Sequence, residues 1–230
     1  MPKVLITGCN RGIGLELTRQ YLKAGWQVVA TAREPANAFK LKELWRAHQD
    51  DLRIYALNVA DHVQLDALAR ELGDEALDVL INNAGAMGPQ PPLGRLDYIE
   101  WNHLFQVNTM APAKMVEAFG PLVGRGTRKL IVNVSTRMAS IADNSSGGAY
   151  AYRSTKAALN AVTKSLAIDL AADGITVIAV HPGWVRTDMG GDGAPVAPQD
   201  SAAGLRALFD RVGPAESGHF FNFDGQELPW

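Results

Sequence analysis

Tyr152 and Lys156 are the two residues of this sequence whose types and spacing best suit proton transfer. They lie near the start of a helical pattern that runs from residue 150 to about 172, so their side chains share one face, a turn apart. A phenol with its ordinary pKa of about 10 is a weak acid at neutral pH. A nearby lysine ammonium lowers that pKa, so the pair predicts a tyrosine tuned for proton transfer. A core tyrosine beside a surface lysine is the alternative interpretation.

A glycine-rich turn joins the first predicted strand, residues 3–7, to a predicted helix over residues 12–24. The turn contains Gly8, Asn10, Arg11, Gly12, Ile13 and Gly14. Glycine lets a backbone approach a ligand closely, and the free N–H groups and the dipole at a helix N-terminus attract a phosphate. The segment therefore predicts a pyrophosphate site, and an ordinary strand-to-helix turn is the alternative.

Strand and helix patterns alternate along the whole sequence. The predicted strands cover residues 3–7, 27–31, 52–57, 77–82, 128–134, 175–180 and 218–222. The predicted helices cover residues 12–24, 36–48, 62–72, 97–122, 150–172 and 201–212. Strands separated by helix-length segments form parallel sheets through right-handed crossovers, with helices on both faces. No linker or repeat divides the chain, so we expect a single doubly wound α/β domain over residues 1–230, with a seven-stranded parallel sheet.

The composition argues against several other classes of protein. Lys and Arg number 22 against 24 Asp and Glu, so no basic field indicates a nucleic acid or a membrane as a partner. No apolar run is long enough to span a bilayer, and the first predicted strand begins almost at Met1, so we expect a cytoplasmic protein. Cys9 is the only cysteine, so we expect no disulfide within the chain and no metal site.

Further motifs accompany the glycine turn and the Tyr-Lys pair. They are Asn82-Asn83-Ala84-Gly85 after a predicted strand, Asn108 in a predicted helix, Val132-Asn133-Val134-Ser135-Thr136, and Pro182-Gly183-x-Val185-x-Thr187. Over nearly all of its length the chain thus resembles the short-chain dehydrogenase/reductase family, which implies a Rossmann-type fold and a nicotinamide cofactor. Residues 137–141, 181–185 and 222–230 are most similar to the sniffer-like and C-factor-like carbonyl reductases of that family.

The resemblance implies a role for each residue of the predicted catalytic group. Tyr152 would be the general acid in carbonyl reduction, Lys156 would lower its pKa and hold the nicotinamide ribose, and Asn108 would hold a relay water. Relatives usually carry a second serine that polarises the substrate carbonyl, and Thr136 stands at that place with its hydroxyl retained. Strand alternation turns Ser135 to the opposite face, so it is the second choice.

Ser140 is a weaker third choice for the substrate-polarising hydroxyl.

The cofactor is expected to be NADP(H). Enzymes of this type that use NAD usually carry an aspartate after the second strand, where this chain has Ala32-Arg33. Arg33 can pair with a 2′-phosphate, and Arg11 in the glycine turn offers a second cation. Asn58 stands where relatives have an aspartate facing the adenine. The remaining expected cofactor contacts are Val59, Asn83, Ala84, Gly85, Pro182, Gly183, Val185 and Thr187.

The substrate is expected to be a small aldehyde, ketone or quinone. Loop-like stretches 88–92 and 190–198 follow strands, at the edge where open α/β sheets bind ligands, so we expect them to wall the pocket; surface connections are the alternative. The expected side chains of the wall are Met87, Arg137, Met138, Tyr150, Trp184 and Met189, each of which could equally be a core residue. The resemblance to C-factor keeps a cofactor-binding signalling protein as the alternative function.

We also expect a homodimer or a tetramer. In the family, the helices that correspond to residues 97–122 and 150–172 pack against a second copy of the chain. Their apolar residues outside the catalytic group are Val107, Met115, Val116, Phe119, Leu159, Val162 and Leu166. Packing of these residues against the sheet of their own chain is the alternative.

Overall fold

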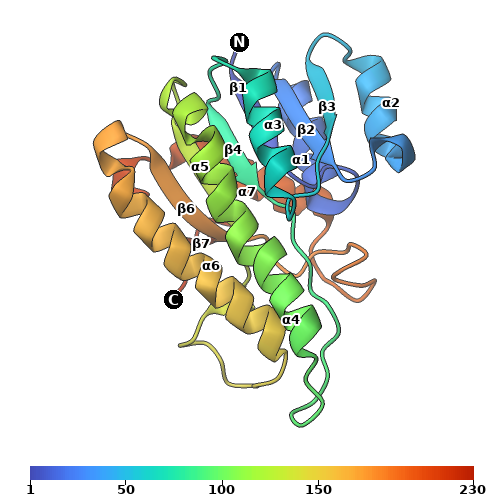
Figure 1. Cartoon of the computed structure of the whole chain (residues 1–230), viewed down its shortest axis with the longest axis vertical. Coiled ribbons are helices and arrows are strands. Elements are labelled where there is room, and N and C mark those ends of the chain that lie inside the picture. Colours follow the sequence, from blue (N-terminus) through green and yellow to red (C-terminus); the bar gives the residue numbers. More distant parts are fainter.

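Seven parallel strands form one sheet in the computed structural model, which describes residues 1–230 (Figure 1). The strands are β1 (Lys3–Ile6), β2 (Gln27–Ala32), β3 (Leu52–Ala56), β4 (Val79–Asn82), β5 (Leu130–Val134), β6 (Thr176–His181) and β7 (Phe220–Asn222). Their spatial order is β3-β2-β1-β4-β5-β6-β7. The chain thus winds outward from β1 to β3 and then crosses back to β4, and the predicted doubly wound, seven-stranded parallel sheet is confirmed.

Helices cover both faces of this sheet (Figure 1). Helices α1 (Gly12–Lys23), α2 (Phe39–Ala47) and α7 (Pro198–Arg211) pack on one face, where 26 buried residues form a core cluster. Helices α3 (His62–Leu72), α5 (Ala111–Gly124) and α6 (Tyr150–Asp169) pack on the other, where a second cluster has 19 buried residues. The short helix α4 (Tyr98–Phe105) precedes α5 and contacts α6.

Successive residues of each strand enter different clusters. In β1, Val4 and Ile6 face α1 and α7, whereas Leu5 between them faces α3 and α5. Because side chains alternate across a strand, both faces of a parallel sheet covered by helices need apolar residues. This explains why the strands appear in the sequence as nearly continuous apolar runs.

The predicted helix over residues 97–122 is interrupted in the structure. A π-helical turn, Gln106–Met110, separates α4 from α5 and contains Asn108. Pro112 lies four residues beyond Asn108 and has no N–H, so the Asn108 carbonyl cannot make its α-helical hydrogen bond. The turn therefore places a catalytic candidate where the helix is irregular.

The helix predicted at residues 62–72 is confirmed by α3, whereas several others differ from their predicted bounds near prolines or at their ends. The helix predicted at residues 36–48 is a 3₁₀ turn, Pro35–Asn37, followed by α2. The helix predicted at 201–212 begins earlier, at Pro198, because proline suits the first helical position. Residue 198 thus belongs to α7, and α6 ends at Asp169 before a 3₁₀ turn, Ala171–Asp173.

No helix in the structure is both long enough and apolar enough to cross a membrane.

Candidate active site

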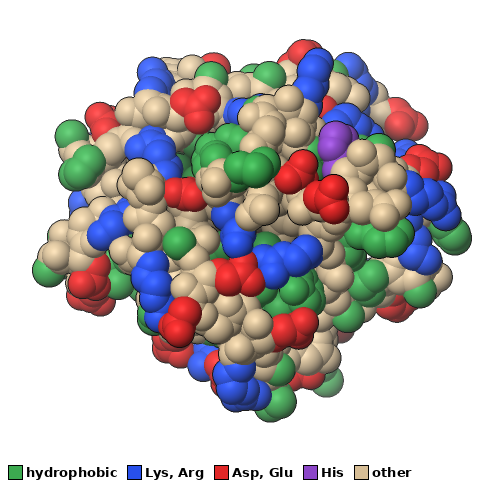
Figure 2. Space-filling view, turned by 90° about the horizontal axis from the view of Figure 1, so that it is seen from above, with side chains coloured by type: hydrophobic (Ala, Val, Ile, Leu, Met, Phe, Trp, Pro, Cys, Tyr) green, Lys and Arg blue, Asp and Glu red, His purple; other side chains and the backbone are tan.

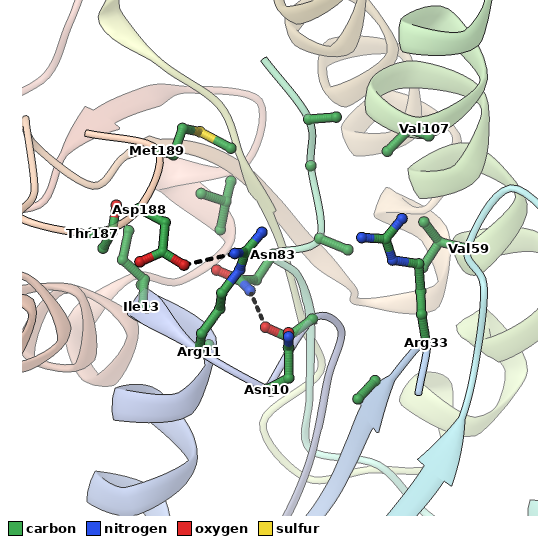
Figure 3. Close-up of a pocket in the computed structure, with 18 of the residues that line it drawn as sticks. Asn10, Arg11, Ile13, Arg33, Val59, Asn83, Val107, Thr187, Asp188 and Met189 are labelled. Atoms are coloured by element: carbon green, nitrogen blue, oxygen red, sulfur yellow. Dashed lines mark hydrogen bonds and ion pairs between the residues drawn. The ribbon is translucent and has the colours of Figure 1, made fainter. Parts of the chain in front are cut away.

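A cavity of about 520 Å³ opens at the carboxyl ends of the strands. It lies where the order of the sheet reverses between β1 and β4, which is the usual ligand site of such folds. Figure 3 shows part of its lining, with the glycine turn on one side and Arg33 on the other. The predicted site residues that line it are Gly8, Asn10, Arg11, Gly12, Ile13, Gly14, Arg33, Asn58, Val59, Asn83, Ala84, Gly85, Tyr152, Lys156, Pro182 and Thr187.

Two of the expected cofactor contacts do not line the cavity. Val185 is buried and forms an isolated β-bridge with Val196, so it joins the two ends of the loop between these residues. Gly183 packs close to Phe223 and Val196.

The cavity also has lining residues that were not among the predicted cofactor contacts. They are Ala32, Glu34, Asn37, Leu57, Ala86, His103, Val107, Val134, Ser135, Asp188 and Met189. Most lie next to a predicted residue at a strand end, so they could have been predicted as its neighbours in the sequence. His103 lies one helical turn before Val107, and only helical periodicity around Asn108 could have indicated it.

At the glycine turn, the start of α1 packs closely against the end of β1. A Cβ added at Gly14 would lie 2.4 Å from the Gly8 carbonyl oxygen and 2.5 Å from Asn83 Nδ2, so no larger residue fits. Gly8 also has φ of +73°, a conformation that glycine adopts without strain. No side chain caps α1, so its first N–H groups stay available for a phosphate.

Hydrogen bonds from Asn83 and Ala84 join the loop after β4 to the end of β1. The Thr7 hydroxyl accepts from the backbone N–H groups of Asn83 at 3.0 Å and Ala84 at 2.9 Å. Asn83 Nδ2 also donates to the Thr7 carbonyl at 2.7 Å. These bonds hold the loop after β4, which lines the cavity, in place without a ligand.

Tyr152 lines the cavity, and Thr136, which does not line it, lies beside the phenol. The phenol is buried, and burial raises the pKa of Tyr152 to about 12, while a hydrogen bond with the Thr136 side chain acts in the opposite direction. We expected Lys156 to lower this pKa, and the shift instead runs upward because desolvation is the largest effect. The phenol is therefore fully protonated at neutral pH.

Lys156 lines the cavity as well. Its ammonium donates to the Val134 carbonyl oxygen at 2.7 Å, at the end of β5. Burial lowers the pKa of Lys156 to about 8. A Cβ added at Gly85 would lie 3.3 Å from both Lys156 Nζ and Asn108 Oδ1, so Gly85 leaves these two groups room at the cavity wall.

The three candidate hydroxyls have different surroundings. Ser135 Oγ donates to Asn160 Oδ1 at 2.7 Å, inside the packing of β5 against α6. Ser140 Oγ donates to the Trp230 carbonyl oxygen at 3.0 Å and accepts from a backbone N–H of its own loop. Thr136 Oγ1 likewise accepts from the Met138 N–H at 3.3 Å. Of the three residues, Thr136 is the one whose side chain bonds with the phenol of Tyr152, whereas Ser135 is the one that lines the cavity.

Every polar atom of the Asn108 side chain is already bonded. Its Nδ2 donates to the Ala86 carbonyl at 2.8 Å and to Thr155 Oγ1 at 3.1 Å, and its Oδ1 accepts from the Ala86 N–H at 2.9 Å. The side chain thus ties the loop after β4 to the π-helical turn. Its backbone carbonyl lacks the α-helical donor, because residue 112 is proline.

The two arginines expected to bind a phosphate are not equivalent. Arg33 is exposed, lines the cavity, and has no acidic partner. Arg11 Nη1 is paired at 2.6 Å with Asp188 Oδ2, as the dashed line in Figure 3 marks. Asn58 Oδ1 accepts from the Ala60 N–H at 3.2 Å, which leaves one lone pair and the amide group for a ligand.

Only one side chain of the expected substrate wall lines the cavity, and that is Met189. Tyr150 lines a separate small hollow beside Pro89, and Trp184 Nε1 donates to the Gly190 carbonyl at 2.7 Å. The remaining members, Met87, Arg137 and Met138, are not part of this lining.

Most of the apolar residues on which the expected oligomer rested face the protein's own interior. Met115, Val116, Phe119 and Leu159 are fully or almost fully buried. Leu166 packs against the same core, and Val107 lines the cavity. They are not a free apolar face, so this part of the expectation was wrong.

The fold and the site together define a class of protein. A doubly wound parallel sheet, an uncapped helix after a glycine turn, and a tyrosine-lysine pair at the strand ends suit a dinucleotide-dependent oxidoreductase. The family model for short chain dehydrogenases matches residues 2–195. The chain belongs to the short-chain dehydrogenase/reductase family, as predicted.

Known relatives and solved structures agree with this assignment. C-signal of Myxococcus xanthus is 41% identical over 164 residues, which cover 71% of this chain and 99% of C-signal. The structure of the carbonyl reductase Sniffer of D. melanogaster matches with a TM-score of 0.95 and 33% identity, covering 100% of both chains. NADPH-bound carbonyl reductase from chicken fatty liver matches with a TM-score of 0.93 and 32% identity, over 100% of this chain and 99% of that one.

Proposed function

We propose that this protein is an NADPH-dependent reductase that converts the carbonyl group of a small aldehyde, ketone or quinone to an alcohol. The observation that carries this proposal is the buried, protonated phenol of Tyr152 in the wall of the cavity, in a hydrogen bond with the Thr136 side chain. Two hydroxyl donors that converge there suit an oxygen that gains negative charge.

The residues of the cavity fit the proposed cofactor. The space that the absent Cβ of Gly14 leaves and the uncapped start of α1 would hold its pyrophosphate. Arg33, which has no acidic partner, would meet its 2′-phosphate, and Asn58 and Val59 would flank the adenine. NADPH, when bound, supplies the hydride.

Tyr152 would then supply the proton. With a pKa of about 12 the phenol is protonated at neutral pH, and it is still a stronger acid than the alcohol that forms. Thr136 would donate a second hydrogen bond to the same oxygen and hold the carbonyl in place.

Lys156 and Asn108 would return a proton to the site. The Lys156 ammonium, with a pKa of about 8, is close enough to neutrality to exchange its proton easily. The Asn108 carbonyl, which lacks its helical donor, would hold the water that connects the buried ammonium to solvent.

The alternative function is cofactor-dependent signalling, which the identity with C-signal supports. The presence of Tyr152, Lys156, Asn108 and Thr136 in one site favours turnover, since a sensor needs only to bind the cofactor.

The discriminating experiment is to follow NADPH oxidation by absorbance against a panel of aldehydes, ketones and quinones. We expect turnover with at least one of them and a preference for NADPH over NADH of about tenfold or more, the contribution of one charged hydrogen bond. Ala32→Asp combined with Arg33→Ala should shift the preference toward NADH. Cofactor binding without turnover on any carbonyl would favour the signalling function instead.

We further propose a cytoplasmic homodimer. The side chains of Met110 and Ile168 remain half or more exposed on the two elements where a dimer was expected, at 50% and 66%. Light scattering at micromolar concentration should give twice the mass of the chain, and a monomer would exclude this assembly.

A further inference from the structure

Arg153 follows Tyr152 directly in the chain, in the first turn of α6, and the mechanism above does not use it. Its Nη1 donates to the Met138 carbonyl at 3.0 Å and its Nη2 donates to Ser146 Oγ at 2.8 Å, so it bonds twice to the loop between β5 and α6. Its Nε is buried without a partner. A guanidinium that bonds to neutral oxygens and leaves a buried N–H unpaired contributes little to stability, which points to another role.

The Met138 carbonyl belongs to a 3₁₀ turn, Arg137–Ala139, that begins directly after Thr136. Thr136 caps this turn, because its Oγ1 accepts from the Met138 N–H at 3.3 Å. The backbone closes the same turn, since the Ala139 N–H donates to the Thr136 carbonyl at 2.9 Å. The position of the Thr136 oxygen therefore depends on where the Met138 peptide is held.

The cap also decides what the Thr136 hydroxyl can still do. A hydroxyl has one proton to donate and two lone pairs that accept. The Met138 N–H occupies one lone pair, so the proton stays available for the phenol of Tyr152 or for a substrate oxygen. Threonine is β-branched and has few allowed rotamers, so a bond that fixes its oxygen also fixes the direction of the hydroxyl.

The far end of the turn has a separate anchor. The Trp230 carbonyl oxygen accepts from Ser140 Oγ at 3.0 Å and from the Ile141 N–H at 3.1 Å. These bonds hold the chain after the turn and leave the Met138 peptide to Arg153. Arg153 is thus the side chain of α6 that ties this peptide to the helix of the proposed general acid.

We propose that Arg153 is a positioning residue of the reduction: it holds the Met138 peptide and, through the capped turn, directs the Thr136 hydroxyl toward the substrate oxygen. Arg153 does not line the cavity, so it acts through these residues and not on the substrate or the cofactor. This inference rests on the proposed function for the identity of the reaction.

A double-mutant cycle with Thr136 tests this role. Values of kcat/KM would be measured for Arg153→Met, which fills similar space without hydrogen bonds, for Thr136→Val, and for the double variant. We expect Arg153→Met alone to lower kcat/KM by about three- to tenfold, the range of one hydrogen bond, with NADPH affinity unchanged. In the Thr136→Val background the same substitution should change kcat/KM by less than about twofold, because no hydroxyl remains to be directed.

Arg153→Lys and Ser146→Ala are the matched controls. Lysine keeps one donor for the Met138 carbonyl and should recover part of the loss. Ser146→Ala removes only the second partner of Arg153 and should keep wild-type kcat/KM. Should Arg153→Met fail to fold, Arg153→Gln, whose amide is too short to reach, takes its place in the cycle. Losses that add in the double variant, or wild-type kcat/KM without the guanidinium, would overturn the proposal.

Amide hydrogen exchange tests the same role without any substrate. The N–H groups of Met138 and Ala139 are bonded within the capped turn. Both should exchange about three- to tenfold faster in Arg153→Met than in the wild type and Ser146→Ala, because the turn opens more often. Equal rates in the three proteins would refute the role of Arg153. A wild-type protein that reduces no carbonyl would refute the proposed function, while exchange would still decide whether Arg153 holds the turn.

Discussion

The charged side chains at the two ends of the sheet differ in how they are paired. At the amino ends, Glu75 accepts a two-pronged contact from Arg53, at 2.6 and 2.7 Å, and a further bond from Lys3. Asp78 accepts from the backbone N–H groups of Lys3 at 2.8 Å and Thr127 at 2.9 Å. Acidic and basic side chains are also interspersed on the face toward the N-terminus (Figure 2).

At the carboxyl ends, Arg11 is paired with Asp188, but Lys156 and Arg33 have no carboxylate partner. The Lys156 ammonium is buried with a backbone carbonyl and no carboxylate, and Arg33 faces an open cavity. The pKa values show the result: hydrogen bonds from Arg53 lower the pKa of Glu75 to about 2, whereas burial lowers that of Lys156 to about 8. Matched charges stabilise the fold, whereas unmatched charges at a cavity lower stability and are typical of functional sites.

The strongest test of this comparison is Tyr152→Phe at the carboxyl end. Removal of the phenolic hydroxyl should lower the reduction rate by about a hundredfold or more, the usual contribution of a general acid. Thermal unfolding and NADPH binding should stay near wild type, because the ring keeps its packing. Turnover close to wild type would remove Tyr152 from the proposed mechanism.

The next largest effect is expected at Thr136. Thr136→Val removes the hydroxyl and should lower kcat/KM by about tenfold or more, whereas Thr136→Ser should be tolerated. Ser135→Ala is the matched control on the neighbouring residue, because its hydroxyl bonds to Asn160 and should affect stability rather than rate. Steady-state kinetics of the three variants would check this, and a larger loss in Ser135→Ala would reverse the two roles.

The pH dependence of the reduction should follow Lys156. The ammonium predominates below its pKa of about 8 and is lost as the pH rises through that value. We therefore expect kcat/KM to fall above this pH, approaching about tenfold for each unit. Arginine keeps its charge, so an active Lys156→Arg variant should lose this alkaline decline. If the alkaline decline of kcat/KM persisted in Lys156→Arg, the decline would belong to the titration of another group.

The smallest effect on activity is expected at the amino end. Glu75→Gln should lower the free energy of unfolding by about 1–2 kcal/mol at pH 7, with kcat/KM unchanged. The folded pKa of Glu75, about 2, lies below its ordinary 4.5, so its stabilisation is present above pH 4.5 and is lost as pH falls toward 2. Urea unfolding at several pH values should show the two proteins converging in acid, and a constant difference would contradict the assigned cause.

Much of the fold and of the site could be predicted from local patterns. The Tyr152–Lys156 spacing, the glycine turn and the alternation of strands and helices each depend on neighbouring residues, and the family resemblance added Asn108 and Thr136. Hydrophobic periodicity did not reveal the interruption of the helix predicted at residues 97–122, and the signal for it in the sequence was Pro112, which removes the α-helical donor of the Asn108 carbonyl.

The electrostatics of the site also needed the structure. The sequence predicted a lowered pKa for Tyr152 from one neighbour, whereas burial from several elements raises it. Arg11 could be recognised as a cation of the glycine turn, but its partner Asp188 lies 177 positions away.

The sequence by itself thus determined the fold class, the family and the edge of the sheet at which the candidate site residues lie, since backbone geometry and side-chain type follow from neighbours along the chain. Only the tertiary structure decided which charges are matched and which hydroxyl meets the phenol. Those outcomes depend on desolvation and on contacts between distant segments, such as Glu75 with Lys3 and Arg53, or Asp188 with Arg11.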